Sequence, residues 1–169
     1  MTDIFKEQIV KRKETTKDRM KRIGLILAVI VVFFVAVSTI PTFTPIITLA
    51  AGFGAYFLTG FLKVEYEYVF TNGELDIDII YNRSRRKRLF SSHVNQFEIM
   101  AHVEDMTYVG SFSNAQEVHN YSSGVNGPDT YAFLVNKNGK QQKIIIEPNE
   151  KMMKAIGGSI SRTKLHLKR

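Results

Sequence analysis

Two uninterrupted apolar segments follow one another near the start of the chain. The first runs from Ile23 to Ile40 and has 18 residues without a charge, and the second runs from Thr42 to Leu62 and has 21. A helix of ~20 apolar residues crosses the hydrocarbon core of a bilayer and satisfies its own backbone hydrogen bonds there. The pattern predicts an N-terminal transmembrane α-hairpin over residues 23–62, with helices at 23–40 and 45–62.

Small residues recur along both predicted helices at spacings of three and four. Such residues let helices approach closely in lipid, where the hydrophobic effect does not drive their association. The predicted packing positions are Gly24, Ala28, Ala36, Thr48, Ala51, Gly52, Ala55 and Thr59. They pack the hairpin on itself or form a homodimer interface, and the sequence leaves both open. Thr44 is the predicted N-cap of the second helix, with Pro45 at its first position.

Positive charge is concentrated on one side of these segments. Residues 1–22 hold eight Lys or Arg against four acids, whereas the loop between the two segments has no Lys or Arg. The positive-inside rule then predicts a multi-pass protein of the cytoplasmic (cell) membrane with both termini in the cytoplasm. A cleaved signal peptide is the competing interpretation, because Ala36-Val37-Ser38 resembles a small-x-small cleavage site.

Residues 1–22 form the predicted basic cytoplasmic N-terminal segment. Phe5 and Ile9 lie four residues apart among Lys and Arg. This spacing fits a short interfacial amphipathic helix, and it fits a frayed basic flank equally well.

From residue 63 the apolar positions alternate with polar ones, which is typical of strands. Val64 to Thr71 and Leu75 to Tyr81 flank Asn72-Gly73, the sequence that best favours a type I′ hairpin turn. Further strands are predicted at 87–91, 94–101, 117–122, 130–136 and 141–147, with Asn138-Gly139 between the last two. Asn149 then caps a helix to about Ile160. The predicted boundaries are a cytosolic domain at 63–160 and a basic tail at 161–169.

Seven strands and a final helix, in this order, resemble the bacterial pleckstrin-homology-like (PH-like) fold, as does the opening stretch Tyr66 to Ile77. The resemblance implies a mainly β domain: a partly open barrel of about seven antiparallel strands closed by a C-terminal helix. The whole chain is also similar to a family of uncharacterised Gram-positive bacterial membrane proteins. Its members share the basic N-terminus, the two-helix hairpin and stretches like residues 65–68, 72–78 and 146–150. That resemblance implies no function, and a fold alone supplies none.

The densest charge cluster lies between the second and third predicted strands. If the hairpin turn at Asn72-Gly73 points away from the membrane, the next turn returns to it, and basic residues near an anionic leaflet gain ~1 kcal/mol each. The predicted contacts with anionic lipid head groups are Arg83, Arg85, Arg86, Lys87 and Arg88. The alternative is a solvated turn that keeps a sheet edge soluble. The acidic face formed by Glu65, Glu67, Asp76 and Asp78 either pairs with cross-strand Lys or Arg or binds a cation.

No pattern of catalytic or ligand-binding residues is evident. The chain has no Cys, its four His show no metal-ligand spacing, and no nucleophile elbow or phosphate-binding loop is present. We therefore predict no cofactor, no metal, no nucleic-acid partner and no enzymatic activity. The predicted role is a membrane-tethered binding or scaffolding module that contacts anionic membrane lipids or a protein partner. The alternatives are an accessory subunit of a larger membrane complex and an enzyme with an unrecognised site. The polar segment 102–129 is either a binding loop or a cover whose aromatic residues protect the core.

Overall fold

The computed structural model describes residues 4–166, which divide into two compact units. The hairpin unit contains residues 14–64 and 81–85, and the β domain contains the remaining described residues. The chain passes between the units several times, so the short turn at 81–85 belongs with the helices although strands of the β domain precede and follow it.

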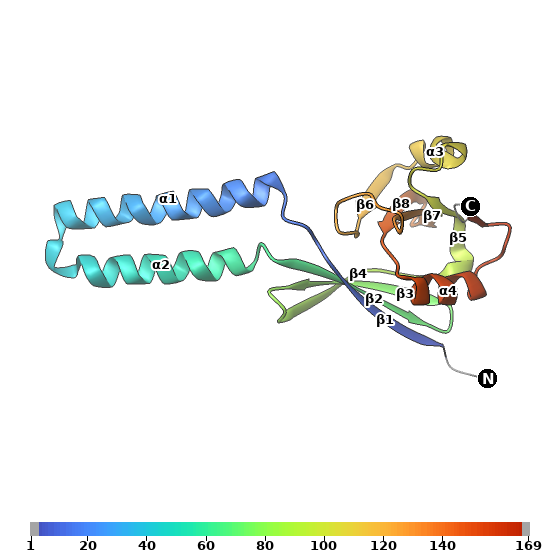
Figure 1. Ribbon diagram of the computed structural model, residues 1–169, viewed down its shortest axis with the longest axis horizontal. Helices are drawn as coiled ribbons and strands as arrows, with labels where there is room; N and C mark the ends of the chain where they lie inside the picture. Colours follow the sequence, from blue (N-terminus) through green and yellow to red (C-terminus); the bar gives the residue numbers. More distant parts are fainter. Residues whose placement is uncertain (1–3, 167–169) are drawn as a thin grey trace. The chain divides into compact units, whose positions relative to one another are not determined.

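The hairpin unit is built from α1 (Thr16–Thr39), the short 3-10 helix η1 (Pro41–Phe43) and α2 (Thr44–Gly60), with α1 and α2 side by side (Figure 1). Both α1 and the span Pro41–Gly60 are long and apolar enough to cross a membrane, and only 6% of each apolar window is buried within the structure. The two predicted apolar helices are therefore present. A helix this exposed and apolar lacks the protein cover that a core helix of a soluble protein would have.

The helix boundaries differ from the predicted ones, and α2 ends at Gly60 rather than at residue 62. α1 begins at Thr16 rather than at residue 23, because the side chains of Thr15 and Asp18 form a capping box. Thr44 is not the N-cap of α2. The preceding 3-10 turn makes Phe43 the cap, and the Thr44 hydroxyl donates to the Ile40 carbonyl at 3.3 Å.

The first sheet of the β domain has four strands in the order β1 (Phe5–Lys11), β2 (Val64–Thr71), β3 (Glu74–Tyr81) and β4 (Arg85–His93). The turn between β2 and β3 confirms the Asn72-Gly73 prediction, since the two residues have φ angles of 49° and 95°. Glycine is required at the second position. A Cβ on Gly73 would lie 2.6 Å from Nε2 of His93.

Strand β1 is a correction to the sequence prediction for the N-terminal segment. Residues 5–11 are neither an amphipathic helix nor a frayed flank. They pair antiparallel with β2, from Phe5 opposite Thr71 to Lys11 opposite Glu65. Val10 faces the core and is 7% exposed, whereas Ile9 is 50% exposed. The basic segment thus contributes an edge strand of the β domain.

The second sheet has five strands in the order β6-β8-β7-β5-β9. Their bounds are β5 (Phe97–His102), β6 (Glu117–Asn120), β7 (Tyr131–Lys137), β8 (Lys140–Ile146) and β9 (Leu165–His166), with a 3-10 turn, η2 (Val94–Gln96), before β5. Helix α3 (Met106–Ser113) lies within the segment predicted to be a loop or a strand, and α4 (Glu150–Ser159) follows Asn149, whose side chain caps it as predicted.

The barrel prediction holds only in its coarser form. The domain is mainly β, but the described residues contain nine strands in two sheets that are not closed, and closure of a barrel by the C-terminal helix is not confirmed. β6 and β9 each pair in parallel with a neighbour, so the arrangement is not wholly antiparallel. The basic tail also takes part, because Leu165 and His166 form β9.

The core lies between the two sheets and α4. Phe133 of β7 stacks on Phe97 of β5, with ring centroids 3.9 Å apart, and reaches Phe90 of β4 at 5.6 Å. Met152 and Ile156 of α4 are at most 1% exposed and are part of this core. Burial of large apolar side chains is the main source of stability, so this aromatic cluster holds the two sheets together.

Candidate functional site

One end of the hairpin unit carries all of its charge. Residues 23–62 contain no charged side chain, yet the unit has seven basic and two acidic residues. The basic ones lie in the first turns of α1, just after α2, and in the turn between β3 and β4. We call them the basic collar: Lys17, Arg19, Lys21, Arg22, Lys63, Arg83 and Arg85. The two acidic residues already have partners in this unit. Glu14 pairs with Arg22 at 2.7 Å, and the side chain of Asp18 takes part in the N-terminal capping box of α1.

The β3–β4 turn is fixed to the end of α2. The Asn82 amide donates to the Lys63 carbonyl at 3.1 Å. The Asn82 side chain also lies against Gly60, where an added Cβ would meet it at 3.1 Å. The absence of a side chain at Gly60 thus leaves room for the turn, which brings Arg83 and Arg85 into the same unit as Lys63.

The backbone of this turn is strained at an arginine. Asn82 and Arg83 have φ angles of 47° and 55°, and the Ser84 amide donates to the Tyr81 carbonyl at 3.1 Å. Type I′ turns favour Asn-Gly because both central residues need positive φ. A left-handed conformation costs a residue with a Cβ roughly 1–2 kcal/mol. Arg83 is thus kept at a central position of the turn in a backbone conformation that Gly or Asn adopts more easily.

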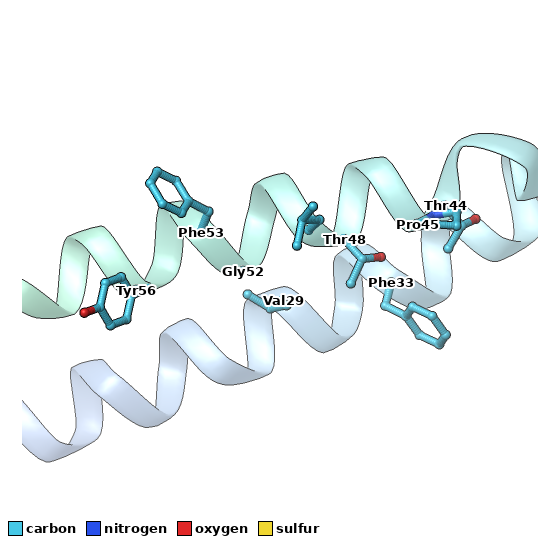
Figure 2. Close-up of a pocket in the computed structure, with 9 residues that line it drawn as sticks. Val29, Phe33, Thr44, Pro45, Thr48, Gly52, Phe53 and Tyr56 are labelled. Atoms are coloured by element: carbon cyan, nitrogen blue, oxygen red, sulfur yellow. The ribbon is translucent and has the colours of Figure 1, made fainter.

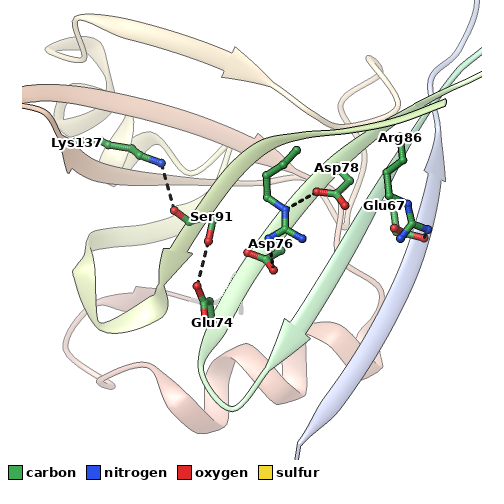
Figure 3. A network of polar contacts seen from close by, with 8 residues as sticks. Glu67, Glu74, Asp76, Asp78, Arg86, Ser91 and Lys137 are labelled. Atoms are coloured by element: carbon green, nitrogen blue, oxygen red, sulfur yellow. Dashed lines mark hydrogen bonds and ion pairs between the residues drawn. The ribbon is translucent and has the colours of Figure 1, made fainter.

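The five basic residues predicted to contact lipid do not form one free cluster. Arg86 pairs with Glu67 at 2.6 Å, and Arg88 contacts Asp76 at 2.8 Å and Asp78 at 2.7 Å (Figure 3). Arg83 and Arg85 belong to the collar. The side chains of Arg85 and Lys87 are exposed and make no hydrogen bond or ion pair with the residues that the structure describes. Arg86 and Arg88 are therefore held on the first sheet by carboxylates, whereas Arg85 and Lys87 remain available for other contacts.

The carboxylates on the acidic face of the first sheet form the ion pairs with Arg86 and Arg88. The prediction that its acids pair with cross-strand basic residues is confirmed for Glu67, Asp76 and Asp78. Within residues 4–166, no group of three His, Cys, Asp or Glu is arranged to hold a metal ion. Glu67 is 1% exposed. Burial raises the pKa of Glu67 above that of an ordinary glutamate; Arg86 opposes the shift, and the neighbouring Glu7 and Asp78 add to it.

The predicted packing positions of the helices fall into two groups. Ala36 is 4% exposed, and the small residues of α2 are half-buried against α1: Thr48, Ala51, Gly52, Ala55 and Thr59. Gly24 and Ala28 are exposed. Thr48 and Gly52 also line an open apolar groove of about 760 Å³ between the helices, together with Phe33 and Tyr56 (Figure 2). Ala28 lines a second groove between the helices together with Ala51 and Ala55, so Gly24 is the predicted position with the least cover. A role of these residues in a homodimer interface stays a prediction.

Aromatic residues of the segment 102–129 cover part of the core, as one of the two interpretations predicts, and a role of the segment as a binding loop stays untested. Phe112 of α3 is 3% exposed and joins Ala101, Ala132 and Leu134, and Tyr108 packs against this group. The ring of Tyr121 contacts Tyr66 at 5.6 Å. Helix α3 was missed because its sequence is rich in Ser and Gly; the signal that could have found it is Asp105, whose side chain caps it. His102 is fully buried and bonded to the Gly127 carbonyl at 3.0 Å.

Sequence reasoning identified the arginines of the turn but missed Lys63, Asn82 and Gly60, which fix their position. The visible signal was the Asn82-Arg83 pair, since Asn tolerates positive φ and favours a type I′ turn. Lys63 also directly follows the apolar segment of α2. The turn packs against Gly60, a contact that depends on the tertiary structure. No pattern in the sequence indicates it.

The family profile described as "bacterial PH-like domain (DUF6106)" matches residues 2–165. The match includes the helical hairpin as well as both sheets, which agrees with the interleaving of the two units along the chain. No curated protein and no solved structure shows a significant match. The match shows that the chain is related to this family and contains a PH-like domain. It does not show what the protein does, because the function of the family is unknown. Because it covers nearly the whole chain, this protein belongs to the bacterial PH-like domain family.

Proposed function

We propose that this protein is a non-catalytic, membrane-tethered binding module whose basic collar contacts anionic lipid head groups. α1 and α2 cross the cytoplasmic membrane, both termini lie in the cytoplasm, and the PH-like domain stands on the cytoplasmic side. The observation that carries the proposal is the strained turn at Asn82-Arg83, fixed to the end of α2 beside Lys63. It sets arginines where an apolar helix ends and where lipid phosphates would begin.

Two physical arguments support this assignment. α2 has 17 residues, and its apolar window reaches from η1 to Gly60, so the collar follows the hydrocarbon-spanning segment directly. Lys and Arg beside a membrane span are attracted to anionic lipids and set the orientation of the span. Arg85 and Lys87 are exposed and available for such contacts, whereas Arg86 and Arg88 are occupied by carboxylates.

The proposed orientation predicts which side of the membrane each end of the hairpin faces. The chain has no Cys, so single cysteines can be introduced as Thr42→Cys in η1 and Ser84→Cys in the turn. In intact cells, a membrane-impermeant maleimide should label Thr42→Cys and should label Ser84→Cys only after permeabilisation. Labelling of Ser84→Cys in intact cells, with Thr42→Cys protected, would show the opposite orientation.

Lipid preference tests two collar residues, Arg83 and Arg85, together with the exposed Lys87 that follows them in the chain. In full-length protein reconstituted in mixed bilayers, spin-labelled phosphatidylglycerol should be motionally restricted more than spin-labelled phosphatidylcholine. Changing Arg83, Arg85 and Lys87 to Gln removes three basic residues, each worth ~1 kcal/mol near an anionic leaflet, so the preference should fall by at least fivefold.

The matched control for this triple change removes the same charge elsewhere. Lys151, Lys154 and Arg162 are exposed and lie on or just after α4. Their replacement by Gln should leave the phosphatidylglycerol preference within twofold of that of the natural sequence. Equal losses in the two triple variants would mean that net charge, and not the collar, governs lipid contact.

A further inference from the structure

Glu67 is a buried carboxylate with a hydrogen-bond partner on only one of its two oxygens. It lies on β2, on the face opposite Tyr66 and Tyr68, and is 1% exposed. Its Oε1 accepts a hydrogen bond from Nη2 of Arg86 at 2.6 Å. Its Oε2 is buried and has no hydrogen-bond partner among the residues that the structure describes. A buried oxygen without a donor is costly, and a proton would satisfy it.

The groups around Glu67 are mostly acidic. Ile9 of β1 lies directly opposite it, with Glu7 two residues away on the same face, and Asp78 of β3 is also close enough to interact with it. Asp78 itself is bound to Arg88 of β4. Arg86 is the one cation with an ion pair to Glu67 among the described residues. Two carboxylates and one arginine thus face a third carboxylate, an arrangement that favours its protonation.

The side chain of Arg86 is exposed enough to change its rotamer when Glu67 loses its charge. Its side chain is 57% exposed, whereas that of Glu67 is 2% exposed. A long exposed side chain can change rotamer without disturbing the core, and its position is then set by the charge it meets. Arg86 also follows Arg85 of the collar directly in the chain.

We propose that Glu67 is a protonation switch for lipid contact: ionised, it holds Arg86 on the sheet, and protonated, it releases Arg86 to the anionic head groups that the collar binds. This inference rests on the proposed function. Acid therefore strengthens lipid contact by adding one basic side chain next to Arg85. The raised pKa of Glu67 moves this change toward neutral pH. An anionic leaflet adds to the effect, because its potential of about −30 mV lowers the local pH by about half a unit.

The experiment measures the phosphatidylglycerol preference of the full chain in bilayers at pH 8 and pH 5, with the spin-labelled lipids used above. One additional basic contact of ~1 kcal/mol corresponds to about a fivefold rise in preference on acidification. Glu67→Gln mimics the protonated form, so it should have the higher preference already at pH 8. Any remaining rise at pH 5 in this variant comes from other groups, such as histidines, and should be well below that of the natural sequence.

Two further variants keep the outcome interpretable. Arg86→Gln removes the released side chain, so its preference should stay low and lose the Glu67-dependent rise. Glu65→Gln changes a carboxylate on the same strand and should respond to pH as the natural sequence does. An equal pH response in the natural sequence and in Glu67→Gln would overturn the switch while leaving the collar intact. The absence of any phosphatidylglycerol preference, at either pH, would overturn the proposed function and the switch together.

Discussion

Val10→Asp is expected to destabilise the β domain by about 3–5 kcal/mol, close to the whole stability of a domain of this size. Val10 is 7% exposed and lies opposite Tyr66 on the core-facing side of β1. A carboxylate there would be buried without a partner. The loss is measured by proteolysis of the full chain in lipid nanodiscs at increasing urea concentrations.

The control for this prediction is Phe5→Asp on the same strand. Phe5 is 56% exposed and faces away from the core. The same charge at that position should change the free energy of unfolding by at most about 1 kcal/mol. If residues 5–11 were an amphipathic helix instead, Phe5 and Ile9 would share its apolar face, and Phe5→Asp would be the more harmful change.

Phe133→Ala is expected to cost about 3–5 kcal/mol by the same measurement. Phe133 is fully buried, and its ring lies between Phe97 and Phe90, so truncation leaves a cavity at the contact between the two sheets. Val125→Ala offers a comparison, since Val125 is 47% exposed and should change stability by no more than about 0.5 kcal/mol. A loss below 1 kcal/mol at Phe133 would show that the sheets do not depend on this aromatic contact.

Strand β1 could not be predicted from the pattern of apolar and polar residues. Its exposed face carries Phe5 and Ile9, while its core-facing positions are Lys6, Gln8 and Val10. Such a strand has no apolar alternation toward the core, so period-2 reading does not find it. Gln8 faces the core because its side chain donates to the Glu147 carbonyl at 2.8 Å and accepts from the Asn149 amide at 2.7 Å. Both partners are about 140 residues away in the chain.

The candidate site was likewise predictable only in part. A run of basic residues after a strand was visible, and so was an acidic face on the preceding hairpin. Pairing between them depends on which side chains share a face of the folded sheet. Arg86 and Arg88 meet carboxylates there, while Arg85 and Lys87 do not, and a list of charges contains no information that separates the two pairs.

The local features of this protein follow from short-range physics and were determined by the sequence. They include the two apolar helices, the turns at Asn72-Gly73 and Asn138-Gly139, and the Asn149 cap of α4. Helix length, positive φ and capping depend on neighbouring residues alone. The tertiary structure decided the remainder: β1 as an edge strand, two unclosed sheets, the turn fixed to Gly60, and Glu67 buried beside Arg86. These depend on contacts between distant segments, whose free energy exists only once the chain has folded.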